Sequence, residues 1–242
     1  MRGFDLDNIQ LTGGWYLDDT EHLVDELKDL FVRHGIDCVD FVGSSKSNTG
    51  SFILAKQLSH IMPGLRMRIF AFTPFTTLEE NYYIAHGIAD KAPGTLKGLW
   101  RDGVINPDIA RLTDASDIVR FNRVKVFQFF PFFSSAGEKL LCERIAGRNI
   151  KNIPLPVSLH NTLFPFWNEV QDQLLETHEG VFRTMPKEDY AFYQDMQKNL
   201  CGKRGLYEIL VNTSRFINAL HYFSTPYFSI RCKPNQMIST GE

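Results

Sequence analysis

The spacing of hydrophobic positions changes several times along this chain, and each change predicts a new element. In residues 20–34 the apolar positions lie three or four residues apart, as on one face of a helix. Thr20 is a suitable N-cap for this helix and Gly35 a suitable stop. Short continuous apolar runs, which are typical of buried strands, follow at 38–42, 66–73, 124–130 and 151–155.

Helical patterns fill the intervals between these predicted strands. They cover 48–61, parts of 78–119 and 135–146, and a further helix is predicted from residue 159 to about 178. Strands that alternate with helices favour a parallel sheet covered by helices on both faces, so the predicted fold class is α/β. Right-handed crossovers then bring the carboxyl ends of the strands to one edge, where a site would form.

The alternation stops near Gly180. Residues 186–222 predict two helices with no strand between them. We therefore expect an α/β domain over 1–180 and a C-terminal helical extension over 181–242, either as an added layer or as a small lid.

Composition narrows the class of protein. The 242 residues include 26 Lys+Arg and 28 Asp+Glu, which gives a net charge of −2 and no basic stripe for nucleic acid. Aromatic residues make up 13% of the chain, which is typical of a globular domain. No apolar run approaches the roughly 18 residues that a membrane-spanning helix needs.

The termini and cysteines suggest a compartment. The first ten residues lack the apolar core of a secretory signal peptide. The four cysteines lie far apart, without the spacing of a metal site or a disulfide framework. We expect reduced thiols, a cytoplasmic location, and neither a metal nor a cofactor.

The richest chemical signal is the turn between the first two predicted elements that follow Gly35. Residues 43–47 (GSSKS) join an apolar strand directly to an amphipathic helix. This is the layout of a nucleophile elbow, which would raise the hydroxyl of Ser45 above the sheet. Two other interpretations stay open: Ser45 is an ordinary turn residue, or the turn binds phosphate through its N–H groups. The pattern lacks the glycine and lysine spacing of a P-loop.

Two more residues complete a candidate triad. Glu138 follows the third predicted strand and His160 the fourth, in the order serine, acid, histidine. Each has a simpler explanation, because Glu138 suits the first turn of a helix and His160 suits a loop before one. Asp114 and Asp117, which precede the third strand, are second-choice acids.

Four segments together resemble a known superfamily. Residues 43–48 (GSSKSN) resemble a Gly-Ser-Ser-Lys-Gly-Gly elbow, and Gly14-Trp15-Tyr16 precede it as an Asn-x-Trp-Tyr or Gly-Trp-Tyr segment commonly does. Residues 141–145 (LCERI) resemble a His-Ala-Glu-Arg-Leu segment, and 156–161 resemble a histidine loop. The chain resembles the α/β-hydrolase superfamily over roughly residues 5–175, and in particular small bacterial esterase- or acyltransferase-like proteins associated with surface-polysaccharide synthesis.

The resemblance implies roles for individual residues. Ser45 would attack an ester or thioester carbonyl, His160 would take its proton, and Glu138 would steady the imidazolium. The Lys46 N–H and the backbone at Gly14 would form the oxyanion hole, with the Asn48 side chain as another candidate donor. Trp15 and Tyr16 either line the substrate cleft or pack in the core, and both interpretations stay open. The acceptor would be water or the hydroxyl of a glycan, and neither nucleic acid nor a membrane span is implied.

Three features depart from the family pattern. Ser47 stands where a glycine relieves crowding in the turn, and the acid is Glu where Asp is commoner. About 35 residues precede the elbow strand, so we expect an N-terminally shortened hydrolase sheet or a part of a longer protein, a partner complex or a homo-oligomer. The alternative function is a catalytically degenerate fold that binds a glycan or a protein.

Overall fold

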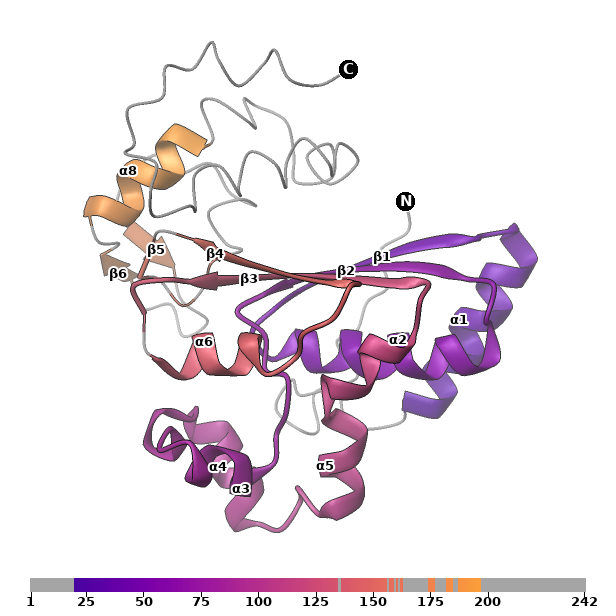
Figure 1. Cartoon of the computed structure of the whole chain (residues 1–242), viewed down its shortest axis with the longest axis horizontal. Coiled ribbons are helices and arrows are strands. Elements are labelled where there is room, and N and C mark those ends of the chain that lie inside the picture. Colours follow the sequence, from indigo (N-terminus) through magenta and orange to yellow (C-terminus); the bar gives the residue numbers. More distant parts are fainter. Residues whose placement is uncertain are drawn as a thin grey trace. The chain divides into compact units, whose positions relative to one another are not determined.

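A computed structural model gives the arrangement of the chain (Figure 1). It describes residues 20–134, 136–155, 157, 158, 160, 162, 174–176, 182–184 and 187–196. The chain forms two compact units, one of residues 1–128 and 135–152 and the other of residues 129–134 and 153–242. Each unit is considered separately below.

The first unit is organised by a four-stranded sheet. The strands are β1 (Cys38–Ser44), β2 (Arg66–Phe72), β3 (Val124–Pro131) and β4 (Ile150–Leu155), in the spatial order β1-β2-β3-β4. They run parallel, and β1 pairs with β2 from Cys38 opposite Arg66 to Ser44 opposite Phe72. The four predicted strands and the general α/β class are confirmed. The boundary between the two units crosses β3 and β4.

Two long helices build the core of this unit. Both α1 (Thr20–His34) and α2 (Ser47–Ile61) pack on the same face of the sheet. Their apolar side chains form one cluster with those of the strands, including Val24, Leu27, Phe31, Phe52, Ala55, Leu58, Met67, Ile69 and Val126. Burying each large side chain of this kind contributes roughly 1.5–3 kcal/mol. The described helices of the first unit lie on this one face, so predicted coverage is confirmed for that face alone.

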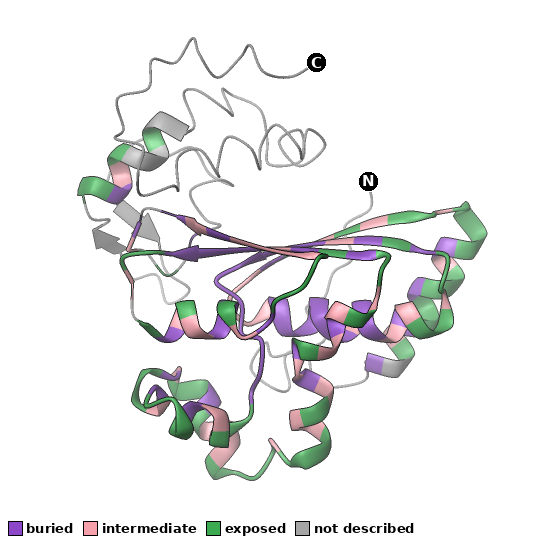
Figure 2. Ribbon diagram, in the orientation of Figure 1, coloured by how far each residue is buried: buried purple, intermediate pink, exposed green. Residues whose placement is uncertain are grey.

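The edge of the sheet is less buried than its centre. Exposed and intermediate residues alternate along most of β1, whereas β2 and β3 are largely buried (Figure 2). Strand β1 has a described neighbour on one side only, which accounts for this difference.

A helical segment separates β2 from β3. It contains α3 (Glu80–Ala85), η1 (Ala89–Lys91), α4 (Gly94–Arg101), α5 (Pro107–Thr113) and η2 (Ala115–Arg120). Asn106 begins α5, because its side-chain oxygen accepts hydrogen bonds from the Asp108 and Ile109 amides, each at 3.0 Å. A second, smaller apolar cluster around Tyr83 and Leu96 holds this segment together.

The ends of two helices show what stops them. Gly35, at φ +61°, ends α1 as predicted, and the Ile36 amide donates to the Phe31 carbonyl at 2.9 Å. Helix α6 (Ala136–Glu143) is shorter than the predicted helix, which extended to residue 146. The chain leaves the helix where the Arg144 side chain turns to bind Asp114 and Ile145 enters the core.

The second unit contains a hairpin and a helix among its described residues. Strands β5 (Leu174–Glu176) and β6 (Phe182–Thr184) pair antiparallel, and α8 (Lys187–Met196) follows. The predicted helix from 159 to about 178 is therefore wrong at 174–176, where pairing with β6 outweighs helical periodicity. Residues 160 and 162 are not helical either, so the prediction is also wrong there. The rest of that prediction, and residues 197–222, lie outside the described residues. The predicted boundary near residue 180 falls between β5 and β6. No helix among the described residues is both long and apolar enough to cross a membrane.

Candidate active site

The turn after β1 places Ser45 in an uncommon conformation. Ser45 has φ +53°, in the left-handed region that residues other than glycine rarely adopt. Its amide donates to the Phe72 carbonyl at 2.8 Å, which extends the pairing of β1 and β2 past the end of both strands. Helix α2 begins two residues later, at Ser47. The predicted strand, sharp turn and helix are therefore all present around Ser45.

The close approach of α2 to β1 depends on Gly43. A Cβ atom at this position would lie 2.6 Å from Asn48 Oδ1 and 3.1 Å from Ser47 Oγ. Any side chain here would have to displace the side chains of Asn48 and Ser47 in the first turn of the helix. A tight strand-to-helix junction of this kind is what a nucleophile elbow requires.

Ser47 fits into this junction by bonding to the backbone. Its hydroxyl accepts from the Ser44 amide at 2.8 Å and donates to the Ser44 carbonyl at 2.9 Å. A serine at position 47 was expected to crowd the turn. In the structure its hydroxyl instead makes two hydrogen bonds that bridge the turn.

Asn48 does not serve as an oxyanion donor, and that part of the expectation is wrong. Its side chain is fully buried, and its Nδ2 donates to the Ser45 carbonyl at 3.2 Å and to the Phe72 carbonyl at 2.9 Å. Both amide hydrogens therefore already have acceptors within the protein.

The remaining candidate residues are Lys46, Glu138, His160 and the segment from Gly14 to Tyr16. Lys46 is half-buried in the turn with helical backbone angles, and Glu138 lies half-buried in the first turn of α6. His160 is exposed and belongs to the second unit, where its carbonyl accepts from the Thr162 amide at 2.9 Å. Convergence of these residues with Ser45 stays a prediction. Gly14, Trp15 and Tyr16 lie outside the described residues.

A second strained residue adjoins the turn. Thr73, which follows β2, has φ +47° and is almost completely buried. Because Ser44 is paired with Phe72, Ser45 and Thr73 leave the sheet at the same level of neighbouring strands. Strain of this kind gathers at functional sites. This conformation could not be predicted from the sequence, since a residue before proline is expected to be extended.

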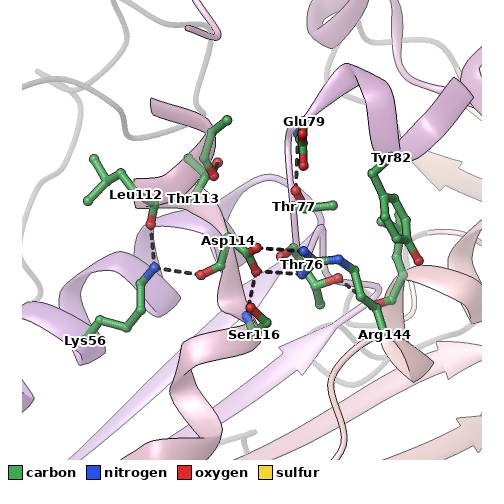
Figure 3. Close-up of polar contacts among 12 residues, drawn as sticks. Lys56, Thr76, Thr77, Glu79, Tyr82, Leu112, Thr113, Asp114, Ser116 and Arg144 are labelled. Atoms are coloured by element: carbon green, nitrogen blue, oxygen red, sulfur yellow. Dashed lines mark hydrogen bonds and ion pairs between the residues drawn. The ribbon is translucent and has the colours of Figure 1, made fainter. Parts of the chain in front are cut away.

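A partly buried ionic network lies elsewhere in the first unit (Figure 3). Lys56 Nζ, from α2, donates to the Leu112 carbonyl at 2.6 Å and to the Asp114 carbonyl at 2.7 Å. Burial lowers the pKa of Lys56, although the nearby carboxylate of Asp114 acts in the opposite direction. A cation at this point also complements the C-terminal end of α5.

Arg144 binds the Asp114 carboxylate with both of its terminal nitrogens, at 2.6 and 2.7 Å. The Ser116 amide donates to the same carboxylate at 2.7 Å. Burial raises the pKa of Asp114, but these hydrogen bonds and the charge of Arg144 outweigh it and lower the pKa to about 2. Asp114 is therefore committed to a structural ion pair, and Asp117 pairs with Arg120 at 3.5 Å. Neither second-choice acid gains support as a triad member.

An open pocket of about 420 Å³ borders this network. Its lining residues are Glu79, Glu80, Asn81, Ile105, Asn106, Pro107, Ala110, Arg111 and Asp114. Ser45, Glu138 and His160 do not line this pocket. Among the described residues, no group of three or more histidine, cysteine or carboxylate side chains is arranged to hold a metal ion.

Comparison with known proteins gives no assignment. No protein-family model matches the chain, and no curated protein matches its sequence. The resemblance to α/β-hydrolases therefore stays a prediction from the sequence motifs of the chain.

Proposed function

We propose that Ser45 is the nucleophile of a serine esterase or acyltransferase. The observation that carries this proposal is the left-handed Ser45 between a parallel strand and a helix, with Gly43 lying directly under that helix. A serine in this position has its hydroxyl exposed beyond the sheet and its neighbours' N–H groups near a developing oxyanion.

The reaction proceeds through an acyl-enzyme. His160 takes the Ser45 proton as Oγ attacks the ester or thioester carbonyl, and the Lys46 N–H stabilises the oxyanion, with the backbone at Gly14 as the second donor. The leaving alcohol or thiol receives the proton from His160, while Glu138 stabilises the imidazolium. Water or a glycan hydroxyl then attacks the acyl-enzyme and restores Ser45. We propose Trp15 and Tyr16 as the residues that contact the substrate.

The order of the strands supports these roles. Ser45 follows β1, Glu138 follows β3 and His160 follows β4. The carboxyl ends of parallel strands share one edge of a sheet, and α/β proteins bind substrates at that edge. Each of the three residues follows the carboxyl end of a strand in the sequence.

A binding protein is the competing proposal. Ser47 and Asn48 stand where the hydrolase pattern has two glycines, so the turn departs from that pattern at two positions. In that case the same sheet edge would bind a glycan or a protein without turning it over.

Covalent labelling with a fluorophosphonate probe separates the two proposals. We expect labelling of the purified protein to disappear in Ser45→Ala and to persist in the matched control Ser44→Ala. Loss of a serine nucleophile can lower turnover by up to about 10⁶-fold, so the contrast should be complete on the labelling timescale. Labelling of Ser45→Ala at the wild-type level would refute the assignment, and an unlabelled wild type would favour the binding protein.

A further inference from the structure

We propose that Ser47 and Asn48 are positioning residues, which together form a polar clamp that holds Ser45 in its left-handed conformation. The structural part of this inference is independent of catalysis, and only its kinetic consequence rests on the proposed function. Neither residue would touch the substrate.

The Ser47 arm of the clamp fixes the strand side of the turn. Its hydroxyl makes hydrogen bonds to both the amide and the carbonyl of Ser44, at 2.8 and 2.9 Å. The residue immediately before Ser45 is therefore bound to the first residue of α2. A glycine at position 47 could make neither bond.

The Asn48 arm fixes Ser45 to the neighbouring strand. Its amide nitrogen bridges the Ser45 carbonyl and the Phe72 carbonyl, at 3.2 and 2.9 Å. The Phe72 carbonyl also accepts from the Ser45 amide at 2.8 Å. The Ser45 amide is thus bound directly to the Phe72 carbonyl at the end of β2, and the Ser45 carbonyl is linked to the same carbonyl through Asn48.

The space for the clamp comes from Gly43. Asn48 Oδ1 occupies the region that a Cβ atom at position 43 would enter, because the two would be 2.6 Å apart. Asn48 is fully buried, and its Nδ2 donates to two carbonyls, which hold the side chain in this position. Glycine at 43 and asparagine at 48 therefore form a complementary pair, and the strained turn at Ser45 is fixed before any ligand binds.

A clamp that acts only on orientation has a distinct kinetic signature. It should change the rate at which Ser45 attacks without changing how strongly the probe is held. Misplacement of a reacting group by about 1 Å can cost about a hundredfold in rate. We expect Asn48→Ala to reduce the maximal labelling rate by about ten- to a hundredfold, with the half-saturating probe concentration unchanged.

The variants require matched controls. Thr49→Val is the control for Asn48→Ala, because Thr49 is equally buried on the next position of α2 and its hydroxyl has no hydrogen-bond partner within the described residues. Ser47→Ala is the milder test of the clamp, since Ser47 is only half-buried. Thermal unfolding of each variant shows whether it is folded at the assay temperature.

Amide hydrogen exchange tests the clamp without catalysis. Ser47→Ala should accelerate exchange of the Ser44 amide, and Asn48→Ala should accelerate exchange of the Ser45 amide, whereas Thr49→Val should leave both unchanged. If the wild type is not labelled but exchange behaves in this way, the proposed function fails and the clamp stands. If folded Asn48→Ala retains both wild-type labelling and wild-type exchange at Ser45, the clamp is refuted.

Discussion

Single residues decide the geometry at the end of β1. The left-handed conformation of Ser45 costs on the order of 1–2 kcal/mol in a residue other than glycine. Buried hydrogen bonds contribute about 0.5–1.5 kcal/mol each, so the bonds made by Ser47, Asn48 and the Ser45 amide are sufficient to offset that strain. The turn is therefore a fixed feature of the folded protein.

Gly43→Ala tests how closely the helix lies on the strand. The added methyl would meet Asn48 Oδ1 at 2.6 Å, so the Asn48 side chain would have to leave its present position and its hydrogen bonds. We expect a loss of stability of about 1–3 kcal/mol, as for other overpacked sites, measured by urea unfolding. Gly64→Ala is the control, since a Cβ atom there meets nothing within 4 Å. A folded Gly43→Ala protein as stable as the control would contradict the tight junction.

The sequence predicts part of this residue-scale picture. The apolar strand, the small-residue turn and the helix that follows it locate Ser45. The roles of Ser47 and Asn48 could not be predicted, because the acceptor on Phe72 lies 24 residues away and depends on the register of two strands. Only the three-dimensional pairing brings the Phe72 carbonyl to the turn.

At the scale of elements, charged side chains hold the helical segment between β2 and β3. Lys56 of α2 binds the two carbonyls at the end of α5, and Arg144, which follows α6, binds the carboxylate of Asp114. Arg144 also donates to the Thr76 carbonyl at 3.3 Å, close to the end of β2. Helix α2, the end of β2 and the residue after α6 are thus connected through residues 112–114. The helices of this segment therefore form a fixed part of the first unit.

The low pKa of Asp114 predicts how this stability depends on pH. The unfolded state holds a proton on this carboxyl below pH 3.8, whereas the folded state does not until about pH 2, so stability rises with pH across this window. We expect the contribution of Asp114 to be complete above pH 3.8 and to be lost as the pH falls through 2. Asp114→Asn should be less stable at neutral pH and should lose this part of the pH dependence.

Urea unfolding at several pH values measures the effect, with Asp108→Asn as the control. Asp108 is highly exposed and pairs with Arg111 only at the surface, so its replacement should change little. An identical acid slope in Asp114→Asn and wild type would show that the ion pair does not contribute.

Elements were predictable where local pattern and tertiary packing agree. The four strands and the two long helices were predicted from apolar runs and helical periodicity. The same apolar side chains pack in the core of the folded protein. The end of α6 was not predictable, because Arg144 is drawn to a partner 30 residues earlier. Strand β5 was missed because three residues carry too little pattern, and pairing with β6 determines their conformation.

At the scale of the whole molecule, the division into two units was not predictable from the sequence. The expected separation placed residues 181–242 in a distinct extension, yet residues 153–242 belong to one unit together with 129–134. Within that unit the segment after β4 is bound to α8. The Asp189 carboxylate, almost fully buried, accepts from the Ser158 amide at 3.0 and 2.9 Å and from its hydroxyl at 3.2 Å.

This link connects α8 to the candidate base. Ser158 lies two residues before His160, so Asp189 fixes the start of the segment that carries the histidine. Hydrogen bonds to a charged group contribute about 1.5–3 kcal/mol, which is enough to hold a short segment in one conformation. If His160 acts as the base for Ser45, Asp189→Ala should slow labelling of Ser45 through the mobility of His160, by about ten- to a hundredfold.

Glu188→Ala is the matched control, because Glu188 is the exposed neighbour of Asp189 on α8. His160→Gln should lower labelling at least as far as Asp189→Ala, and combining the two should add little, since both act through the same side chain. Additive losses would mean that α8 supports Ser45 by a route other than His160. Unchanged labelling in His160→Gln would show that the base is a different residue, while leaving Ser45 as the nucleophile.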